Sequence, residues 1–493
     1  MPEHIRAYIV VLALAFIAFS MSKKTICNLS SYHNFDARRN AWLILTSVAF
    51  LVTNFWVYSA VAILVFFFTA SRDANKLGLY YFLLFVLPPI SVSIYGGGVF
   101  NYLISISHPR LLSICILVPL IFKMSGSIFR PKNKIDLFVM SYFVLSIYLN
   151  FRASLSFTDA IRYVLYDFID IFIPYMVFSR YLGSFKQLND VLLAYVTAAG
   201  VLSAIAIFEF LRGWLLYVAM MYSLGIDWGV NEYIGRAGNL RAIASTAQPI
   251  ALGYVLTVAF GFWLVFKDNL LEKKTWYLGA CLISAALIAT LSRGPWLGLV
   301  VLMVVFITTG RRPITKLFQL SGFILAGSMV ALLTSSGRNI IATLPFIGWE
   351  EQDNVSYRQD LFEAAYDVIM RNPLLGSSNY RESPEFLAIS EGQVDVVNTY
   401  LSISLNSGMI GLFIFSMTFI FAIASLYKAL QKLPDNELQN IKVLGRSLIA
   451  ILVATLVILA TVSPISFVPI VYWSLLGLST AYLRLVNKTE NVN

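Results

Sequence analysis

The sequence predicts an all-α polytopic integral membrane protein with about 12–15 transmembrane helices and a large outer loop that contains an amphipathic helix. Of the 493 residues, 58% are hydrophobic and only 13% are charged, whereas an ordinary soluble protein has roughly 25% charged residues. The hydrophobic residues also gather in long runs, and a helix that crosses a bilayer needs about 20 mostly apolar residues. We therefore treat residues 1–493 as a single membrane domain.

The same composition excludes several classes of protein. There are too few charges to cover the surfaces of two or three soluble domains, which excludes a cytosolic enzyme and a disordered protein. The three cysteines, Cys27, Cys115 and Cys281, lie far apart, so we expect neither a disulfide scaffold nor a metal site, and no cofactor. The net charge of +10 is typical of membrane proteins with basic cytoplasmic loops, and we expect no nucleic-acid partner.

The apolar runs predict the spans in order. Ala7–Met21 follows Arg6, but no small-residue cleavage site comes after it, so we expect a retained first span rather than a signal peptide. Ala41–Ala70 is too long for one upright helix, and the polar pair Thr53 and Asn54 predicts a tight helical hairpin there. The other predicted spans lie near Leu77–Tyr95, Leu111–Phe122, Ile135–Asn150, Ala160–Phe178, Leu188–Leu211, Pro249–Phe266, Thr275–Leu291, Pro295–Thr308, Leu317–Leu333, Thr399–Tyr427, Val443–Thr461 and Val468–Leu485.

Charges in the connecting segments predict the orientation. The segment 335–395 has ten carboxylates and four arginines, whereas four other segments are basic. Because lysine and arginine accumulate on the cytoplasmic side, the acidic segment is expected on the outer side. The basic residues concerned are Lys23, Lys24, Arg38, Arg39, Lys123, Arg130, Lys132, Lys134, Arg311, Arg312, Lys316, Lys428, Lys432, Lys442 and Arg446.

Two outer loops, 212–248 and 335–397, are then expected to form a cap over an active site. Within the second loop, apolar residues recur every three to four positions from Leu361 to Ile369, which indicates a helix. Asn372-Pro373 is expected to end it. We expect this amphipathic helix to lie on the outer membrane surface.

Three arginines from separate outer segments are the principal candidates for chemistry. Arg293 lies between two apolar runs, where an ionisable residue is costly and functional more often than not. Arg241 precedes the span at Pro249, and Arg358 begins the amphipathic helix. Each has a plainer interpretation: an interfacial arginine, a loop end, or a surface ion pair with Asp360 or Glu363. Together they would suit a lipid diphosphate, because a guanidinium donates two parallel hydrogen bonds to phosphate.

Asp395 is the candidate base, since it lies just before the chain re-enters the membrane at Asn398-Thr399-Tyr400-Leu401. A carboxylate there would be able to accept a proton from a sugar hydroxyl. The chain has only three histidines, and none follows His108, so chemistry in the C-terminal part would proceed without imidazole.

Several of these segments resemble the O-antigen ligase and polymerase superfamily of bacterial inner-membrane glycosyltransferases. The resemblance is carried by Ser292-Arg293-Gly294, by Arg241 through Pro249, by Arg358 through Phe362 with Asn372 through Gly376, and by Asn398-Thr399-Tyr400-Leu401 with Gly408 through Leu412. The family's histidine position is Val397 here, which favours a polymerase over a ligase. The family's tryptophan in the outer helix is Phe362.

The resemblance implies a polysaccharide polymerase that joins repeat units carried on undecaprenyl diphosphate at the periplasmic face. It assigns catalytic roles to Arg241, Arg293, Arg358 and Asp395, and substrate binding to Asn398, Tyr400 and Arg236, with no metal. The implied partners are the lipid-linked oligosaccharide, membrane lipids, and a chain-length regulator or flippase. The alternatives are a ligase that transfers a glycan to a lipid or protein acceptor, and a transporter of lipid-linked sugars, for which internal repeats would be expected.

Overall fold

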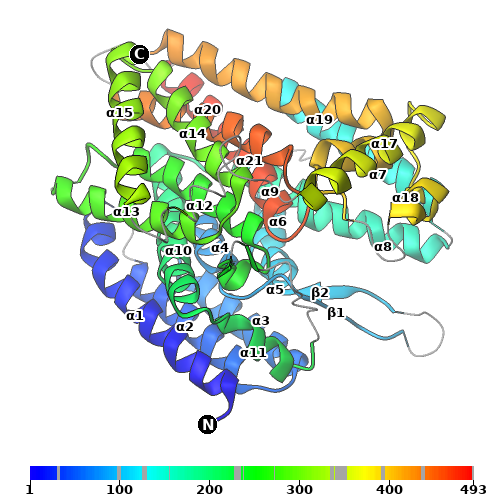
Figure 1. Ribbon diagram of the computed structural model, residues 1–493, viewed down its shortest axis with the longest axis horizontal. Coiled ribbons are helices and arrows are strands. Elements are labelled where there is room, and N and C mark those ends of the chain that lie inside the picture. Colours follow the sequence, from blue (N-terminus) through cyan, green and yellow to red (C-terminus); the bar gives the residue numbers. More distant parts are fainter. Residues whose placement is uncertain are drawn as a thin grey trace.

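The computed structural model describes residues 1–29, 34–96, 102–124, 130–154, 156–226, 235–236, 238–270, 272–333, 338, 352–389, 395–434 and 439–490. It is 79% helical, and the predicted class, an all-α polytopic membrane protein, is confirmed. The described strands form two small antiparallel hairpins, in which β1 pairs with β2 and β3 pairs with β4. Figure 1 shows the helices packed side by side, with the β1–β2 hairpin projecting from them.

The first half of the chain contains α1 (Glu3–Leu29), α2 (Phe35–Leu51), α3 (Phe55–Arg72), α4 (Lys76–Leu84), β1 (Ser91–Ser93), β2 (Ser105–Ser107), α5 (His108–Leu112), the π-helical turn η1 (Ser113–Leu117), α6 (Val118–Lys123), α7 (Lys134–Ala153), α8 (Phe157–Asp167), the π-helical turn η2 (Phe168–Phe172), α9 (Ile173–Tyr181) and α10 (Phe185–Arg212).

The second half contains α11 (Leu216–Ser223), β3 (Gly235–Arg236), β4 (Asn239–Leu240), the 3₁₀ turn η4 (Ala244–Thr246), α12 (Pro249–Leu264), α13 (Lys273–Ala289), α14 (Arg293–Thr308), α15 (Pro313–Leu332), α17 (Gln352–Arg371), the 3₁₀ turn η5 (Tyr380–Glu382), α18 (Pro384–Ile389), α19 (Thr399–Lys432), α20 (Gln439–Leu459) and α21 (Val468–Glu490).

The predicted helical hairpin at Ala41–Ala70 is confirmed. Helix α2 ends at Leu51, and α3 begins at Phe55 and packs against it. Asn54 starts the second helix, because its side chain accepts a hydrogen bond of 2.8 Å from the backbone N–H of Trp56. The predicted polar break therefore acts as a helix cap.

Three of the predicted spans are not single uninterrupted helices. The run Leu77–Tyr95 contains the nine-residue helix α4 and the strand β1. The prediction that this run forms one membrane span is therefore wrong. Leu111–Phe122 and Ala160–Phe178 contain the π-helical turns η1 and η2. Apolar content alone did not reveal these changes, because a π turn keeps the helix direction and alters only the hydrogen-bond register.

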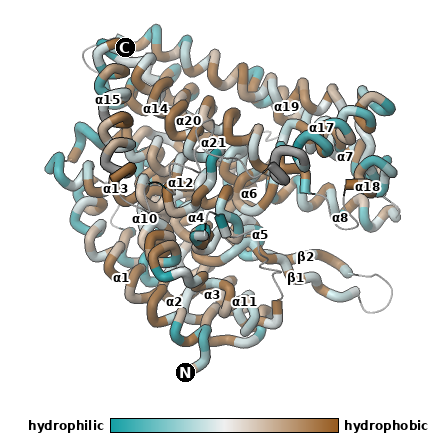
Figure 2. Tube along the Cα trace, in the orientation of Figure 1, coloured by the Kyte–Doolittle hydropathy of each residue, from teal (hydrophilic) through white to brown (hydrophobic). Residues whose placement is uncertain are grey.

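The described helices support a multi-pass membrane protein. Six are long and apolar enough to cross a bilayer, namely α1, α3, α7, α10, α19 and α20, and α12 and α14 are shorter apolar helices. Figure 2 shows that brown, hydrophobic segments predominate along them, whereas α17 and α18 carry more teal, hydrophilic residues. Large apolar side chains such as Phe16, Phe67 and Phe318 are exposed, as expected of surfaces that face lipid.

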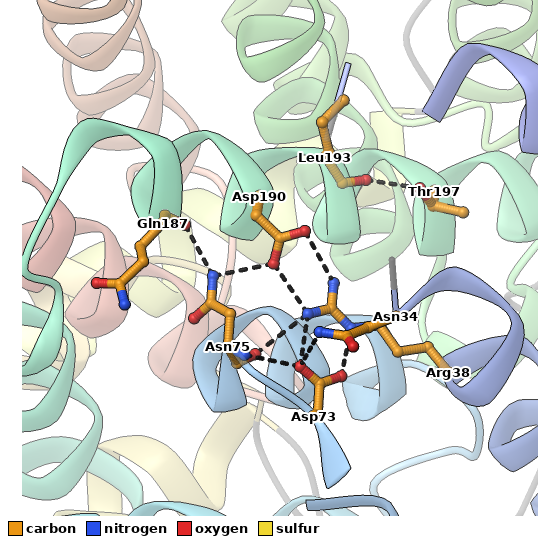
Figure 3. Close-up of polar contacts among 8 residues, drawn as sticks. All are labelled: Asn34, Arg38, Asp73, Asn75, Gln187, Asp190, Leu193 and Thr197. Carbon is orange, nitrogen blue, oxygen red and sulfur yellow. Dashed lines mark hydrogen bonds and ion pairs between the residues drawn. The ribbon is translucent and has the colours of Figure 1, made fainter. Parts of the chain in front are cut away.

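A buried ion-pair cluster joins α2, the α3–α4 connection and α10 (Figure 3). The Arg38 guanidinium bonds to Asp73 at 2.7 Å and to Asp190 at 2.8 Å, and all three side chains are at most 5% exposed. The amide of Asn75 donates to Asp190 at 2.9 Å, and that of Asn34 donates to Asp73 at 2.8 Å. Arg38, which the sequence suggested as an ordinary cytoplasmic loop charge, thus connects three elements of the core.

Candidate functional site

The turn between α13 and α14 presents Arg293 at a helix start. Helix α13 ends at Ala289, and α14 begins at Arg293 itself, whose side chain is half-buried. Between them Leu291 has a φ of +45°, which is costly for a branched side chain. Arg293 thus lies at the N-terminus of α14. The positive end of the helix dipole at this position favours the binding of an anion.

Arg241 and Arg236 both reach the backbone of this turn. The Nε of Arg241 donates to the Thr290 carbonyl at 3.2 Å, and its Nη2 donates to the Ser292 hydroxyl at 2.9 Å. Arg236 donates from Nη1 to the Leu291 carbonyl at 2.8 Å. Two of the three predicted clamp arginines, Arg241 and Arg293, together with Arg236, are thus gathered around four consecutive residues.

Glu209 fixes the segment that carries Arg241. This carboxylate is fully buried near the end of α10 and accepts backbone N–H bonds from Leu216 at 3.1 Å, Ile243 at 3.0 Å and Ala244 at 2.8 Å. Ala244 has a φ of +45°, so one of these bonds supports a strained backbone position. Glu209 was not predicted, although it is one of two carboxylates, with Asp190, inside the apolar run Leu188–Leu211, and a carboxylate in such a run is a signal of function.

Replacing Glu209 by glutamine is expected to lower the free energy of unfolding by about 1–3 kcal/mol, because the new amide N–H would face donors that need an acceptor. Thermal unfolding in detergent measures the change. Glu363→Gln, at an exposed carboxylate of α17, is the matched control and should leave the midpoint unchanged. Equal midpoints for both variants would mean that Glu209 does not fix the segment.

Asp395 and Gly294, the neighbour of Arg293, both contact the turn between α20 and α21. The hydroxyl of Ser463 in that turn donates to Asp395 Oδ1 at 2.6 Å. In the same turn, the Thr461 side chain packs so closely on Gly294 that a Cβ there would lie 1.9 Å from its hydroxyl oxygen. A single turn therefore touches both the neighbour of Arg293 and the candidate base, and Gly294 is the residue that permits the approach.

Tyr357, the residue before Arg358 in α17, contacts Asp395. The Tyr357 hydroxyl donates to the Asp395 backbone carbonyl at 3.3 Å, and partial burial together with the Asp395 carboxylate raises the pKa of Tyr357 above its ordinary value. Arg358 itself is exposed. Tyr357, the first residue of α17 whose side chain is described, therefore lies beside Asp395.

Asn398 and Tyr400 have structural partners in this structure. Asn398 caps α19, because its Oδ1 accepts from the backbone N–H groups of Tyr400 at 2.9 Å and Leu401 at 3.2 Å. The Tyr400 hydroxyl donates to the Leu456 carbonyl at 2.6 Å. Their predicted contact with sugar hydroxyls stays a prediction.

The end of helix α17 is predicted correctly, but its start and its surroundings are not, because the helix begins at Gln352 and not at Arg358. It ends at Arg371, directly before Asn372-Pro373. The apolar face expected to contact the membrane, Leu361 to Val368, is buried against Tyr380, Phe386, Val396 and Leu405, so that expectation is wrong. A second set of side chains, Phe362, Tyr366 and Met370, is more than half exposed at four-residue spacing.

The turn after α17 is joined to a break in α19 by backbone bonds. Gly408, inside α19, has a φ of +65°, and Gly376 has the same value. The N–H groups of Met409 and Ser377 donate to Pro373 at 2.8 Å and to Leu405 at 2.7 Å respectively. A Cβ on Gly376 would lie 2.4 Å from the Leu405 carbonyl oxygen, so only glycine fits here.

Parts of the predicted cap lie outside the described residues, including the carboxylates Glu232 and Glu391, and so does the Asp353 side chain. Among the residues that the structure describes, no group of three or more His, Cys, Asp or Glu side chains would suit a metal ion.

The family model described as O-antigen ligase matches residues 278–416. This segment runs from α13 through α14, α15, α17 and α18 into α19, and it includes Arg293, Arg358 and Asp395. Residues 278–416 form an O-antigen ligase family domain. No curated protein matches the chain.

The O-antigen ligase family domain agrees with the resemblance that the sequence motifs indicate. Members of this family are glycosyltransferase-like membrane enzymes, ligases and polymerases, that act on lipid-linked oligosaccharides. The two family segments that end at Gly376 and begin at Gly408 are the ones joined by the backbone bonds described above. Arg236, Arg241 and Glu209 lie outside the matched range but contact its α13–α14 turn or the segment beside it.

Proposed function

We propose that this protein is a bacterial polysaccharide polymerase of the inner membrane, which joins repeat units carried on undecaprenyl diphosphate at the periplasmic face. The observation that carries the proposal is the gathering of Arg236, Arg241 and Arg293 around the start of α14. Guanidinium groups at a helix N-terminus suit a diphosphate. Val397 at the family's histidine position favours the polymerase over the ligase.

In the proposed reaction, a hydroxyl oxygen of the acceptor glycan attacks the anomeric carbon of the donor glycan. The bond from that carbon to the diphosphate oxygen breaks, its electron pair stays on the oxygen, and the hydroxyl proton passes to a base. Undecaprenyl diphosphate leaves with an additional negative charge on the terminal phosphate oxygen that was bonded to the sugar. Arg241, Arg293 and Arg358 would stabilise that charge, which is the role of preorganised cationic donors in phosphate chemistry.

Asp395 is the proposed base. Its Oδ1 already accepts a bond from Ser463, which would orient the carboxylate and leave the second oxygen for a sugar hydroxyl. Because the diphosphate is a good leaving group, we assign Asp395 a smaller share of the rate than the arginines.

The test is a reaction in vitro with full-length protein in detergent and the undecaprenyl-diphosphate-linked repeat unit of its host. We expect a ladder of products that differ by one repeat unit on a gel. Donor that stays intact until a separate lipid or protein acceptor is added would replace the polymerase by a ligase. Intact donor that crosses the bilayer of sealed vesicles would replace the enzyme by a transporter.

A further inference from the structure

One face of α10 is left open along its length. The helix is mostly buried, but Val196, Gly200, Ala204 and Ile207 are only half-buried, and Leu211 is 72% exposed. Their spacing of four, four, three and four residues puts them on a single face. Apolar and small side chains thus form a continuous strip from the middle of α10 to its end, close to Glu209.

Helices α1 and α13 form the walls of this strip. Both pack on α10, and between them lies a cavity of about 130 Å³. Met21 of α1 and Leu278 of α13 line it and are more than half exposed, so the space opens at the molecular surface. Its floor includes Gly200, where an added Cβ would meet no atom within 4 Å.

The size and lining of this groove suit a hydrocarbon chain. Its lining is almost entirely apolar, and an apolar cavity of about 150 Å³ binds benzene. It is therefore wide enough for one isoprene unit, which has five carbons. A helix from a second copy would be too wide, since a helix with side chains measures about 10–12 Å across.

The length of the groove favours a polyprenyl chain over the acyl chain of a phospholipid. Thr275, at the deep end, lies fifteen positions before Thr290, whose carbonyl bonds to Arg241. At 1.5 Å per residue this is about 22 Å. One leaflet is only about 15 Å deep, half of the roughly 30 Å hydrocarbon core, so a chain that starts at the arginines and reaches Thr275 must pass the bilayer midplane.

We propose that the groove between α1 and α13 binds the tail of the polyprenyl diphosphate donor, with Gly200 as the residue that keeps it open. The inference rests on the proposed function, because it takes the diphosphate to lie at Arg241 and Arg293. The tail then runs along the open face of α10, past Ile207 and Ala204, to the cavity at Gly200.

A labelling experiment tests this without requiring turnover. Full-length protein in phospholipid nanodiscs is exposed to undecaprenyl diphosphate that carries no sugar and has a diazirine on an isoprene unit near the middle of its chain, about 22 Å from the diphosphate. After irradiation, we expect label on α10 and α13 peptides, reduced about tenfold, or ~1.4 kcal/mol, by Gly200→Phe. Gly200→Ala and Gly322→Phe are controls, since Gly322 on α15 also has open space around it.

Each outcome decides one question. Label on other helices, equal labelling of Gly200→Phe, or competition by phosphatidylglycerol as strong as by undecaprenyl diphosphate would overturn the groove as a polyprenyl site. If Gly200→Phe does not fold, Leu282→Trp on the opposite wall replaces it. Labelling as expected, with no glycosyl transfer from any donor, would remove the proposed function and leave a polyprenyl diphosphate site.

A kinetic readout complements the labelling. With the full-length donor, Gly200→Phe should raise KM about tenfold at unchanged kcat. With a donor on a chain of three isoprene units, too short to reach the cavity, wild type and variant should have the same KM. An equal rise in KM for both donors would indicate a general disturbance and contradict the proposed tail site.

Discussion

Replacing Arg293 by alanine is expected to lower the rate of glycosyl transfer by about 10²- to 10³-fold, the usual effect of removing one preorganised donor from a developing anion. The expectation is strong because Arg293 begins α14 and because Arg241 bonds to the preceding residue, Ser292. The loss should appear in kcat more than in KM, since the leaving diphosphate gains charge only as the bond breaks. Product formation per unit time, measured with saturating donor, tests it.

Two variants make this result specific to the guanidinium. Arg293→Lys keeps the charge but lacks the planar fork, so an intermediate rate is expected. Arg311→Ala removes an arginine just beyond the other end of the same helix and should have no effect. If Arg293→Ala stays folded and retains a rate within about tenfold of the unsubstituted protein, Arg293 does not stabilise the leaving group.

Replacing Arg38 by alanine is expected to destabilise the protein by about 3–5 kcal/mol, because it leaves buried carboxylates without their cation. Asp73 and Asp190, both at most 4% exposed, would lose contacts of 2.7 and 2.8 Å. The thermal midpoint in detergent and the amount of protein recovered from membranes should both fall.

The neighbouring residue provides the matched control. Arg39 pairs with Asp36, whose side chain is 54% exposed, and an exposed pair contributes about 0–1 kcal/mol. Arg39→Ala should therefore unfold near the midpoint of the unsubstituted protein. If Arg38→Ala unfolded at the same temperature as Arg39→Ala, the cluster would not stabilise the packing of α2 and α10 against the α3–α4 connection.

The sequence predicts those features that depend on residues close together in the chain. Apolar runs predict most helices, the polar residues Thr53 and Asn54 predict the α2–α3 hairpin, and Asn372-Pro373 marks the end of α17. The cost of an arginine between two apolar runs indicates that Arg293 is unusual. In each case the physical cause lies within a few residues of its effect.

The remaining features depend on contacts between distant segments. Glu209 acts on Ile243 and Ala244, more than thirty residues away, and Arg38 contacts Asp190 across 152 positions. Likewise, the buried face of α17 has the same pattern as a face on lipid, since periodicity shows that a face is apolar but not what covers it. Strand β1 was missed because it lies in the apolar run Leu77–Tyr95, and an apolar run is compatible with both a helix and a strand. Strand β2, Ser-Ile-Ser, lies outside every predicted span.

Gly376 and Gly408 allow the turn after α17 to be attached to α19 mainly through backbone hydrogen bonds. The turn after α17 and the break in α19 are tied through main-chain N–H and carbonyl groups, and the Arg152 guanidinium of α7 also bonds to the carbonyls of Leu375 and Gly376, at 2.9 Å each. A Cβ at either glycine would meet backbone atoms of the other segment, so a substitution at either position would disturb the attachment. The exposed residues of α17 take no part in this attachment, so they can vary while the helix keeps its place.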